Sequence, residues 1–147
     1  MLKLILKIVL FIILIPVVIF VGLYIAAPDG SEFVHKNPET TAFIRQRTAE
    51  YQKAGKKVAL HWQWVPITKI SPNIIHAVIL AEDARFYEHI GFDVEAIKFA
   101  LEKNKKRKKY AFGGSTITQQ LAKNLYLSTK KSIPRKVQEL IIAFKME

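Results

Sequence analysis

A run of twenty positions near the amino terminus, residues 8–27, is apolar and is interrupted only by Pro16 and Gly22. As an α-helix this run is about 30 Å long, which matches the thickness of the hydrocarbon core of a bilayer. A cleaved signal peptide is the alternative, but its apolar core is shorter, and residues 25–27 lack the small residue expected three positions before a cleavage site. We therefore predict an uncleaved transmembrane anchor at residues 8–27.

The charges on either side of this run predict its orientation. Lys3 and Lys7 precede it, whereas Asp29 and Glu32 follow it. The positive-inside rule then places residues 1–7 in the cytoplasm and the rest of the chain outside. Residues 28–57 are polar and form a juxtamembrane spacer, and residues 58–147 form one modest domain.

The chain carries a formal net charge of +11, and this excess is concentrated in one window. Residues 98–136 contain twelve Lys or Arg residues and a single acid, Glu102. The densest part, residues 103–109, has no interleaved aromatic residue, so it favours a solvated loop or a contact with anionic lipid over a nucleic-acid site. The chain has no cysteine, which excludes disulfides and thiolate metal sites, and the spacing of its four histidines is not that of metal ligands.

The hydrophobic pattern of residues 58–147 predicts a mainly helical domain with one short strand. Apolar residues alternate over residues 58–65, which is typical of a strand. Four helix starts follow at Ser71, Asp93, Thr116 and Ser132, each of which is a residue type that caps helix amino termini. Thr116 and Gln119 have the spacing of a capping box.

The most informative acid is Glu82, near the end of the first of these helices. The 3.6-residue period places it on one face with Ile75, Val78, Ile79 and Phe86. A carboxylate between aliphatic and aromatic neighbours is desolvated, as the groups used in general acid–base catalysis often are. The alternative from this face alone is a solvated acid at a helix end or one that pairs with Arg85.

A second candidate site combines a glycine turn with cations. Gly113 and Gly114 precede the capped helix at Thr116, and backbone N–H groups at a helix start favour anions. Lys123, Arg135 and Lys136 lie on this helix and the next, within reach of one side of a small domain, where they could bind a pyrophosphate. An ordinary glycine turn, and a surface pair of Arg135 with Glu139, explain the same residues without a ligand.

Three segments in this order resemble the first three motifs of the peptidoglycan glycosyltransferases. They are Glu82-Asp83-x-x-Phe86-x-x-His89-x-Gly91, Gly113-Gly114-Ser115-Thr116-Ile117-Thr118-Gln119-Gln120 with Lys123-Asn124, and Arg135-Lys136-x-x-Glu139. With one anchor, a short spacer and Trp62-x-Trp64-Val65-Pro66 before the first motif, the chain looks like the monofunctional type.

The resemblance implies the amino-terminal part of a lysozyme-like, mainly α-helical domain on the outer face of a bacterial cytoplasmic membrane. Such an enzyme polymerises lipid II into β-1,4 glycan strands, with inversion at the donor sugar, and releases undecaprenyl pyrophosphate. Its partners are lipid II, the growing lipid-linked strand, membrane lipids and other cell-wall synthesis or division proteins, with no nucleic acid. No tightly bound cofactor is expected beyond a divalent cation, Mg²⁺ or Mn²⁺, with the pyrophosphate.

The resemblance also assigns roles to individual residues. Glu82 matches the catalytic base, and Glu139 matches a second catalytic glutamate that assists the leaving group directly or through the cation. Substrate and pyrophosphate positions are matched by Asp83, Ser115, Thr116, Gln119, Gln120, Lys123, Arg135 and Lys136. The residues that support the motifs are Phe86, His89, Gly91, Gly113, Gly114 and Asn124.

Two other functions remain open from the sequence. A lysozyme-like hydrolase would use Glu82 as a general acid, although its neutral leaving sugar has little need of nearby cations. A non-catalytic module anchored in the membrane would use only the basic window to bind an anionic surface.

The resemblance ends at the third motif, whereas family members continue into further helices with two more motifs. We therefore expect this chain to be part of a longer reading frame and to be inactive alone. The measurement is the incubation of the 147-residue chain with lipid II, and glycan polymer in that assay would refute the expectation.

Overall fold

The computed structural model describes residues 1–57, 59–109 and 111–147, and every regular element in this part of the chain is helical. The six α-helices are α1 (Leu2–Ala26), α2 (Ala42–Lys53), α3 (Pro72–Glu82), α4 (Val94–Arg107), α5 (Ile117–Tyr126) and α6 (Ile133–Met146). Two short 3₁₀ turns, at Ser31–Phe33 and Ile67–Lys69, lie in the connections before α2 and α3. The predicted mainly helical fold is confirmed.

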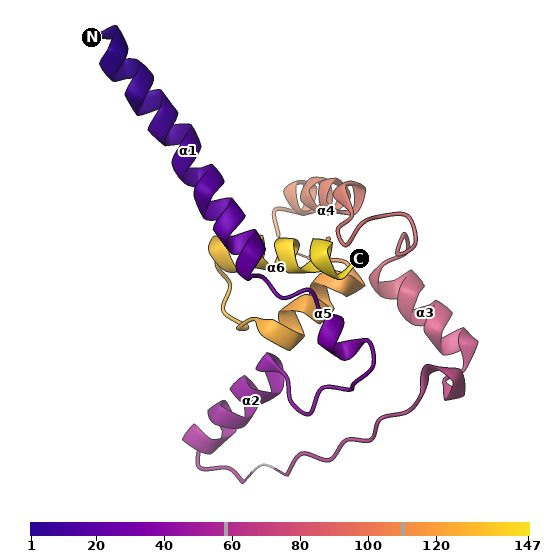
Figure 1. The fold of residues 1–147 in the computed structure, drawn as a ribbon. Coiled ribbons are helices and arrows are strands. Elements are labelled where there is room, and N and C mark those ends of the chain that lie inside the picture. The colour runs from indigo at the N-terminus through magenta and orange to yellow at the C-terminus, as the bar shows by residue number, and fades with distance from the viewer. Residues whose placement is uncertain (58, 110) are drawn as a thin grey trace.

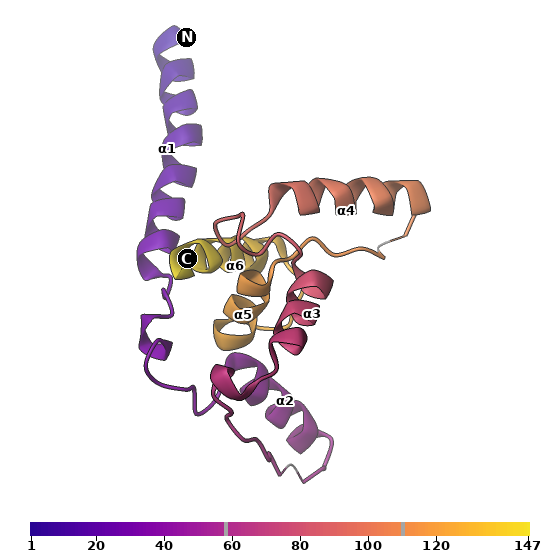
Figure 2. The same cartoon turned by 90° about the vertical axis from the view of Figure 1, so that its right-hand side faces the viewer.

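Helix α1 extends away from all the other helices (Figures 1 and 2). Its 25 residues give a length of about 37 Å, and every residue from 3 to 22 is exposed. An 18-residue window within it has a mean hydropathy of 3.3, so the helix is long and apolar enough to cross a membrane. The predicted span at residues 8–27 lies within this helix up to its C-cap at Ala27, and the helix continues toward the amino terminus through the lysines at positions 3 and 7.

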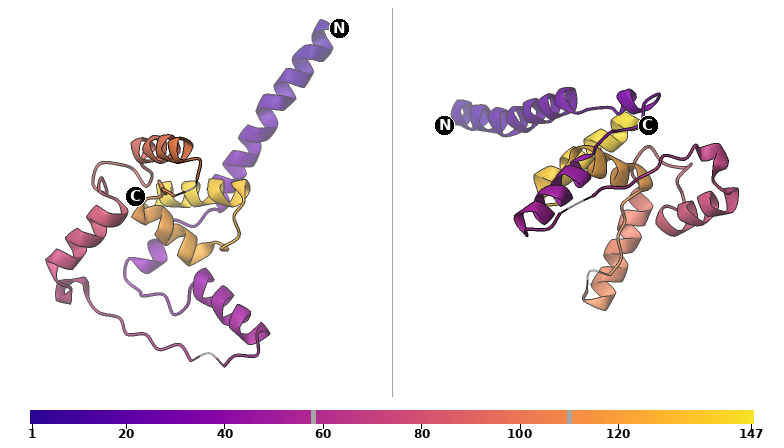
Figure 3. Two further views of the ribbon diagram at one scale, coloured as in Figure 1. Left: turned by 180° about the vertical axis from the view of Figure 1, so that it is seen from behind. Right: turned by 90° about the horizontal axis from the view of Figure 1, so that it is seen from below.

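The core of the remaining chain lies where α5 packs on α6, and α2 packs against α5 on the other side (Figures 1 and 3). Ala122 of α5 and Ile142 and Ala143 of α6 are buried there, with at most 2% of their surface exposed. Tyr126, at the end of α5, donates a hydrogen bond to Glu32 in the turn after α1 (3.3 Å). Burial and the Glu32 carboxylate raise the pKa of Tyr126 to about 12.

Three of the four predicted helix caps form. Asp93 accepts hydrogen bonds from the backbone N–H groups of residues 95 and 96, at 2.8 and 3.0 Å. Thr116 and Gln119 form the complete capping box, and Ser132 accepts from the backbone of Arg135 at 3.4 Å. Ser71 precedes α3 without a side-chain bond, and Pro72, at the first helical position, starts that helix.

The predicted strand at residues 58–65 is wrong for residues 59–65, which have no regular structure, and Val58 lies outside the described residues. Trp62 and Trp64 pack against each other instead, with ring centroids 5.5 Å apart, and are 44% and 52% exposed. A strand is stable only beside another strand, and the described residues form none. The alternation therefore has no sheet to join.

Gly91 allows the loop after α3 to pass close to α6. Its φ of +83° lies in the left-handed region, and a Cβ atom there would lie 2.6 Å from the carbonyl oxygen of Ala143. A side chain at this position therefore meets backbone that cannot move without shifting the core helix. This explains the glycine that ends the first motif.

We predict that Gly91→Ala lowers the free energy of unfolding by about 2–3 kcal/mol, because it adds a steric clash to the left-handed strain. Gly55→Ala is the matched control, since Gly55 has a φ of +70° but nothing within 4 Å of its Cβ position. The control should lose only about 1 kcal/mol. Urea unfolding of the detergent-solubilised chain, followed by circular dichroism at 222 nm, measures both. Equal losses in the two variants would contradict the predicted clash.

Candidate functional site

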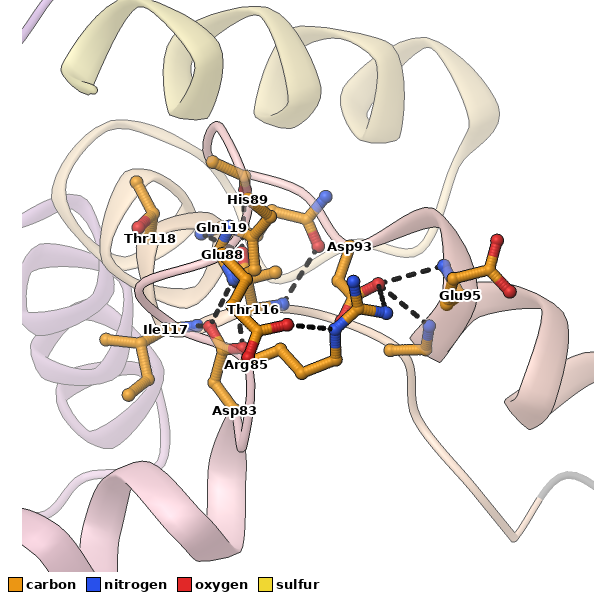
Figure 4. Close-up of polar contacts among 12 residues, drawn as sticks. Asp83, Arg85, Glu88, His89, Asp93, Glu95, Thr116, Ile117, Thr118 and Gln119 are labelled. Carbon is orange, nitrogen blue, oxygen red and sulfur yellow. Dashed lines mark hydrogen bonds and ion pairs between the residues drawn. The ribbon is translucent and has the colours of Figure 1, made fainter.

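The loop after α3 is held to the start of α5 by the buried carboxylate of Asp83, which is 7% exposed (Figure 4). One oxygen accepts a hydrogen bond from the backbone N–H of Ile117 at 3.0 Å. The Nε2 atom of His89 lies 3.0 Å from both carboxylate oxygens. Asp83 therefore joins the first motif to the second through the backbone donor of Ile117, and the His89 side chain ties the loop of the first motif to the same carboxylate.

A second set of bonds strengthens this junction. The hydroxyl of Thr116 donates to the carbonyl oxygen of Gly91 at 2.7 Å and accepts from the backbone N–H of Gln119 at 3.1 Å. The Gln119 side chain in turn accepts from the Thr116 backbone at 3.2 Å. Thr116 and Gln119 are 2% and 0% exposed, so these partners lie inside the protein. Phe86 supports the same loop by an edge-on contact with the His89 ring, 6.3 Å between centroids.

Glu82 is the last residue of α3, and its side chain is exposed. The expectation that it is desolvated on an apolar face with Phe86 is wrong. The packed side of α3 runs from Ile75 and Ile79 to Asp83, in steps of four residues, and Val78 and Glu82 lie outside it. Phe86 is not on the helix, because the chain turns after Glu82.

The exposed carboxylate of Glu82 nevertheless has a defined position. It accepts a hydrogen bond from the side-chain amide of Gln120 on α5, at 2.9 Å. It also lines an open groove of about 380 Å³ between the end of α3, the start of α4 and the glycine turn at residues 113–116. A molecule that enters this groove would meet the Glu82 carboxylate directly.

The glycine turn forms one wall of this groove, and its two glycines differ in their surroundings. A Cβ atom on Gly114 would lie 2.9 Å from Cα of Ile97 and 3.0 Å from the carbonyl oxygen of Ala96, so α4 approaches the turn closely here. Gly113 has no atom within 4 Å of its Cβ position. Close packing therefore explains Gly114 and leaves Gly113 without an explanation from the structure.

The predicted cations come together in a smaller hollow of about 180 Å³ between α5 and the start of α6. Four cationic side chains and one carboxylate line it, together with Ser115, Gln120 and Thr129. The charged residues are Lys123, Lys131, Arg135, Lys136 and Glu139. We refer to these five residues as the cation pocket. Its formal charge of +3 makes it suited to an anion with several negative charges.

Glu139 is the buried member of this pocket, with a side chain only 3% exposed. Its two oxygens are paired with Arg135 Nη1 and Lys136 Nζ, each at 2.5 Å. Lys136 also donates to the hydroxyl of Ser115 at 2.9 Å. The pair of Arg135 with Glu139 is therefore buried, unlike the surface pair considered from the sequence, and it fixes the direction in which both cations point.

Both oxygens of Glu139 accept bonds from cations, so they do not fit direct coordination of Mg²⁺ or Mn²⁺ as well. The described part of the chain contains no group of three or more His, Asp or Glu side chains that could hold a metal ion. Binding of a divalent metal ion through the pyrophosphate stays a prediction.

The groove and the cation pocket adjoin each other. Ser115 lines both hollows, and the bond from Gln120 to Glu82 crosses from the pocket to the groove. The predicted groups Glu82, Gln120, Lys123, Arg135, Lys136 and Glu139 are thus brought to one side of the domain. Asn124 is exposed on α5, and its predicted supporting role stays a prediction.

Sequence reasoning did not select two features of this region. Lys131 lines the cation pocket, although the sequence analysis counted it only as part of the basic window. Arg85 pairs with Glu88 at 2.9 Å and reaches Asp93 at 3.5 Å, which connects the loop to the cap of α4. The hydrogen bond that Arg85 donates to the Glu88 carboxylate raises the pKa of Arg85.

Comparison with known proteins identifies relatives of this chain. A family model described as Transglycosylase matches residues 48–147. A biosynthetic peptidoglycan transglycosylase of Thiobacillus denitrificans is 47% identical over 115 residues, which cover 78% of this chain and 50% of that protein. One from Dechloromonas aromatica is 49% identical over 111 residues, 76% of this chain and 48% of that protein. One from Janthinobacterium sp. (strain Marseille) is 42% identical over 147 residues, 99% of this chain and 63% of that protein.

The chain therefore spans about half the length of most of the curated relatives it matches.

We predict very different stability losses for substitutions of the two adjacent acids. Asp83→Ala should lower the free energy of unfolding by about 2–4 kcal/mol, because it leaves buried donors of the Ile117 backbone and His89 without acceptors. Glu82→Ala should change it by less than about 0.5 kcal/mol, because that side chain is exposed. Urea unfolding of both variants measures the difference, and a large loss for Glu82→Ala would show that its carboxylate has a structural role.

Proposed function

The chain belongs to the transglycosylase family, and from that premise we propose that it supplies the catalytic carboxylate and the diphosphate site of a peptidoglycan glycosyltransferase. The proposed reaction joins lipid II units into β-1,4 glycan strands and releases undecaprenyl pyrophosphate. The observation that carries the proposal is the position of the Glu82 carboxylate, 2.9 Å from an amide that lines the cation pocket. This arrangement supports a role for the acid at the attacking hydroxyl and a role for the cations at the departing diphosphate of the same reaction.

Glu82 acts in this proposal as the general base. Because it lies at the end of a helix and faces an open groove, an acceptor sugar in the groove can bring its 4-hydroxyl within hydrogen-bond distance. The carboxylate takes the hydroxyl proton while the oxygen attacks C1 of the donor sugar. The bond from Gln120 restricts the rotation of the carboxylate and holds one oxygen, so that the other is available to the acceptor.

The cation pocket holds the diphosphate of the donor. As the C1–oxygen bond breaks, negative charge grows on the diphosphate, and cations already in place stabilise it without reorganising. The contribution of Lys123, Arg135 and Lys136 is therefore greatest in the transition state, so their loss should affect turnover more than binding. Lys131, which the sequence analysis did not assign to the site, lines the same pocket and belongs to this set of cations.

Glu139 serves here as a positioning residue. Its buried carboxylate aligns Arg135 and Lys136 toward the pocket and leaves a net positive charge for the diphosphate. No step of this mechanism passes through a metal ion. A Mg²⁺ or Mn²⁺ ion bound by the diphosphate would add further charge stabilisation.

The membrane anchor suits this chemistry, because the substrate is itself anchored by a lipid. We propose that α1 spans the cytoplasmic membrane with its amino terminus inside and that the site faces outward. The lipid-linked strand and other cell-wall synthesis proteins are then partners on that face. Membrane lipids surround α1 and contact the basic window.

We predict that Glu82→Gln lowers the rate of lipid II polymerisation by about 10²–10⁴-fold, because the amide cannot accept the proton. The assay uses a chimera in which residues 1–147 replace the matching part of the Janthinobacterium relative. Glu88→Gln is the control, since Glu88 is an exposed carboxylate on the neighbouring loop that pairs with Arg85. It should retain the rate within about threefold.

Purified glycan strands are incubated in parallel. Polymerisation that survives Glu82→Gln would contradict the role of this carboxylate. Shortening of the purified strands without growth of new polymer would show a hydrolase instead.

A further inference from the structure

Lys145, in the last turn of α6, contacts the end of the apolar helix α1. Its ammonium donates hydrogen bonds to the carbonyl oxygens of Tyr24, at 3.2 Å, and Ala27. The same ammonium lies over the Tyr24 ring, 5.3 Å from its centroid. A single side chain, 121 residues away from Tyr24 in the sequence, thus makes three contacts with the anchor.

We call the contact between the end of α1 and the last turn of α6 the joint. The position of Lys145 at the carboxyl terminus of α1 explains how it stabilises the joint. The last four carbonyl groups of an α-helix have no partner within the helix, and the helix dipole places partial negative charge there. A cation that donates to these carbonyls gives them a hydrogen-bond partner and also offsets the partial negative charge. Lys145 is therefore a cap for the carboxyl terminus of α1, provided by another part of the fold.

Met146 makes a second contact beside the first. It packs with Ala27 against the buried cluster of α5 and α6. Its side chain also lies against Gly30, where a Cβ atom would be 3.2 Å from the methionine Cε. Gly30 has a φ of +77°, and the turn it allows brings the chain after the anchor back onto α6. The joint is thus held by an ionic cap and by close packing.

Helix α6 connects this joint to the cation pocket. Arg135, Lys136 and Glu139 lie toward its start, and Lys145 lies in its last turn. Lys145 follows Lys136 by nine positions, which is about 14 Å along the helix. Figures 1 and 2 show that α6 lies across the end of α1 instead of continuing its direction.

If α1 spans a bilayer, it lies close to the membrane normal. Because α6 crosses the end of α1 and does not extend its line (Figures 1 and 2), α6 then stays close to the membrane surface. Tyr24 at the joint is of the residue type that marks the interface between hydrocarbon and headgroups. The cation pocket is therefore close to the headgroups, where the diphosphate of a membrane-bound polyprenyl lipid lies.

We propose that Lys145 is a positioning residue that docks the anchor onto α6 and so holds the cation pocket at the depth of lipid diphosphates. This inference rests on the proposed function for the identity of the ligand, but the joint itself can be tested without it. Lys145 touches neither sugar nor diphosphate. It acts by fixing the angle and distance between α1 and α6.

The joint is tested by pulsed electron paramagnetic resonance on the full chain in lipid nanodiscs. Because the chain has no cysteine, Ile25→Cys and Gln138→Cys introduce two unique labelling sites, on α1 and α6. We expect one narrow distance distribution, which Lys145→Met broadens and Lys145→Arg restores. Lys130→Met removes a charge from the exposed connection before α6 and should leave the distribution narrow. A distribution that Lys145→Met does not change would overturn the inference.

The effect on depth is tested by two binding measurements on the same nanodiscs. Lys145→Met should weaken the binding of undecaprenyl pyrophosphate in the bilayer by up to about tenfold, because loss of one charged hydrogen bond makes the docked arrangement of α1 and α6 about tenfold less favourable. The binding of inorganic pyrophosphate from solution should not change. Equal weakening of the binding of both ligands would show that Lys145 merely supports the pocket. That result would overturn the inference that Lys145 sets the depth of the pocket in the membrane. Failure of the wild-type chain to bind either ligand would contradict the proposed function, whereas the distance measurement would still test the joint.

Discussion

The structure of the site depends on the carboxylate of Asp83, which is buried between two parts of the chain that are far apart in sequence. A buried charge is costly unless hydrogen bonds compensate it. The backbone of Ile117 and the ring of His89 supply those bonds. Since the bond to Ile117 is made at the first turn of α5, the end of α3 and the start of α5 cannot move independently. Glu82 takes its position from this junction, because it directly precedes Asp83.

A second buried carboxylate organises the opposite half of the site. Glu139 pairs with two cations of the pocket, so its negative charge offsets the repulsion between the positive groups that meet there. Removal of a partner from such a buried pair leaves an uncompensated charge, which is why these pairs fix geometry even where they add little stability. Asp83 and Glu139 thus have related functions: one places the carboxylate of Glu82, and the other aligns the cations.

Much of this arrangement could be predicted from the sequence because it depends on local rules. Helix caps at Asp93, Thr116 and Ser132 follow from the hydrogen bonds that a short polar side chain makes to its own next turn. The sequence predicts Lys123, Arg135 and Lys136 on one side of a small domain, because two consecutive helices carry them, and the packing of α5 on α6 brings them into one pocket. The exposure of Glu82 could not be predicted, because periodicity identifies an apolar face without showing where the helix ends. A helix one turn longer would have kept Phe86 beside Glu82, and the turn at residue 83 buries the next acid instead.

The other differences between the predicted and the observed structure depend on contacts between residues that are distant in the sequence. The alternation at residues 59–65 has the period of a strand, yet strands also require a neighbour, and the described residues offer none. Lys145 illustrates the same limit more clearly. In the sequence it is one of twenty-three basic residues, and it lies outside the basic window. Only the folded chain brings it to the end of α1, where α6 joins the anchor at one end and carries the cations at the other. The same helix thus contacts the apolar helix α1 at one end and lines the cation pocket at the other, and local sequence rules predict only the second of these contacts.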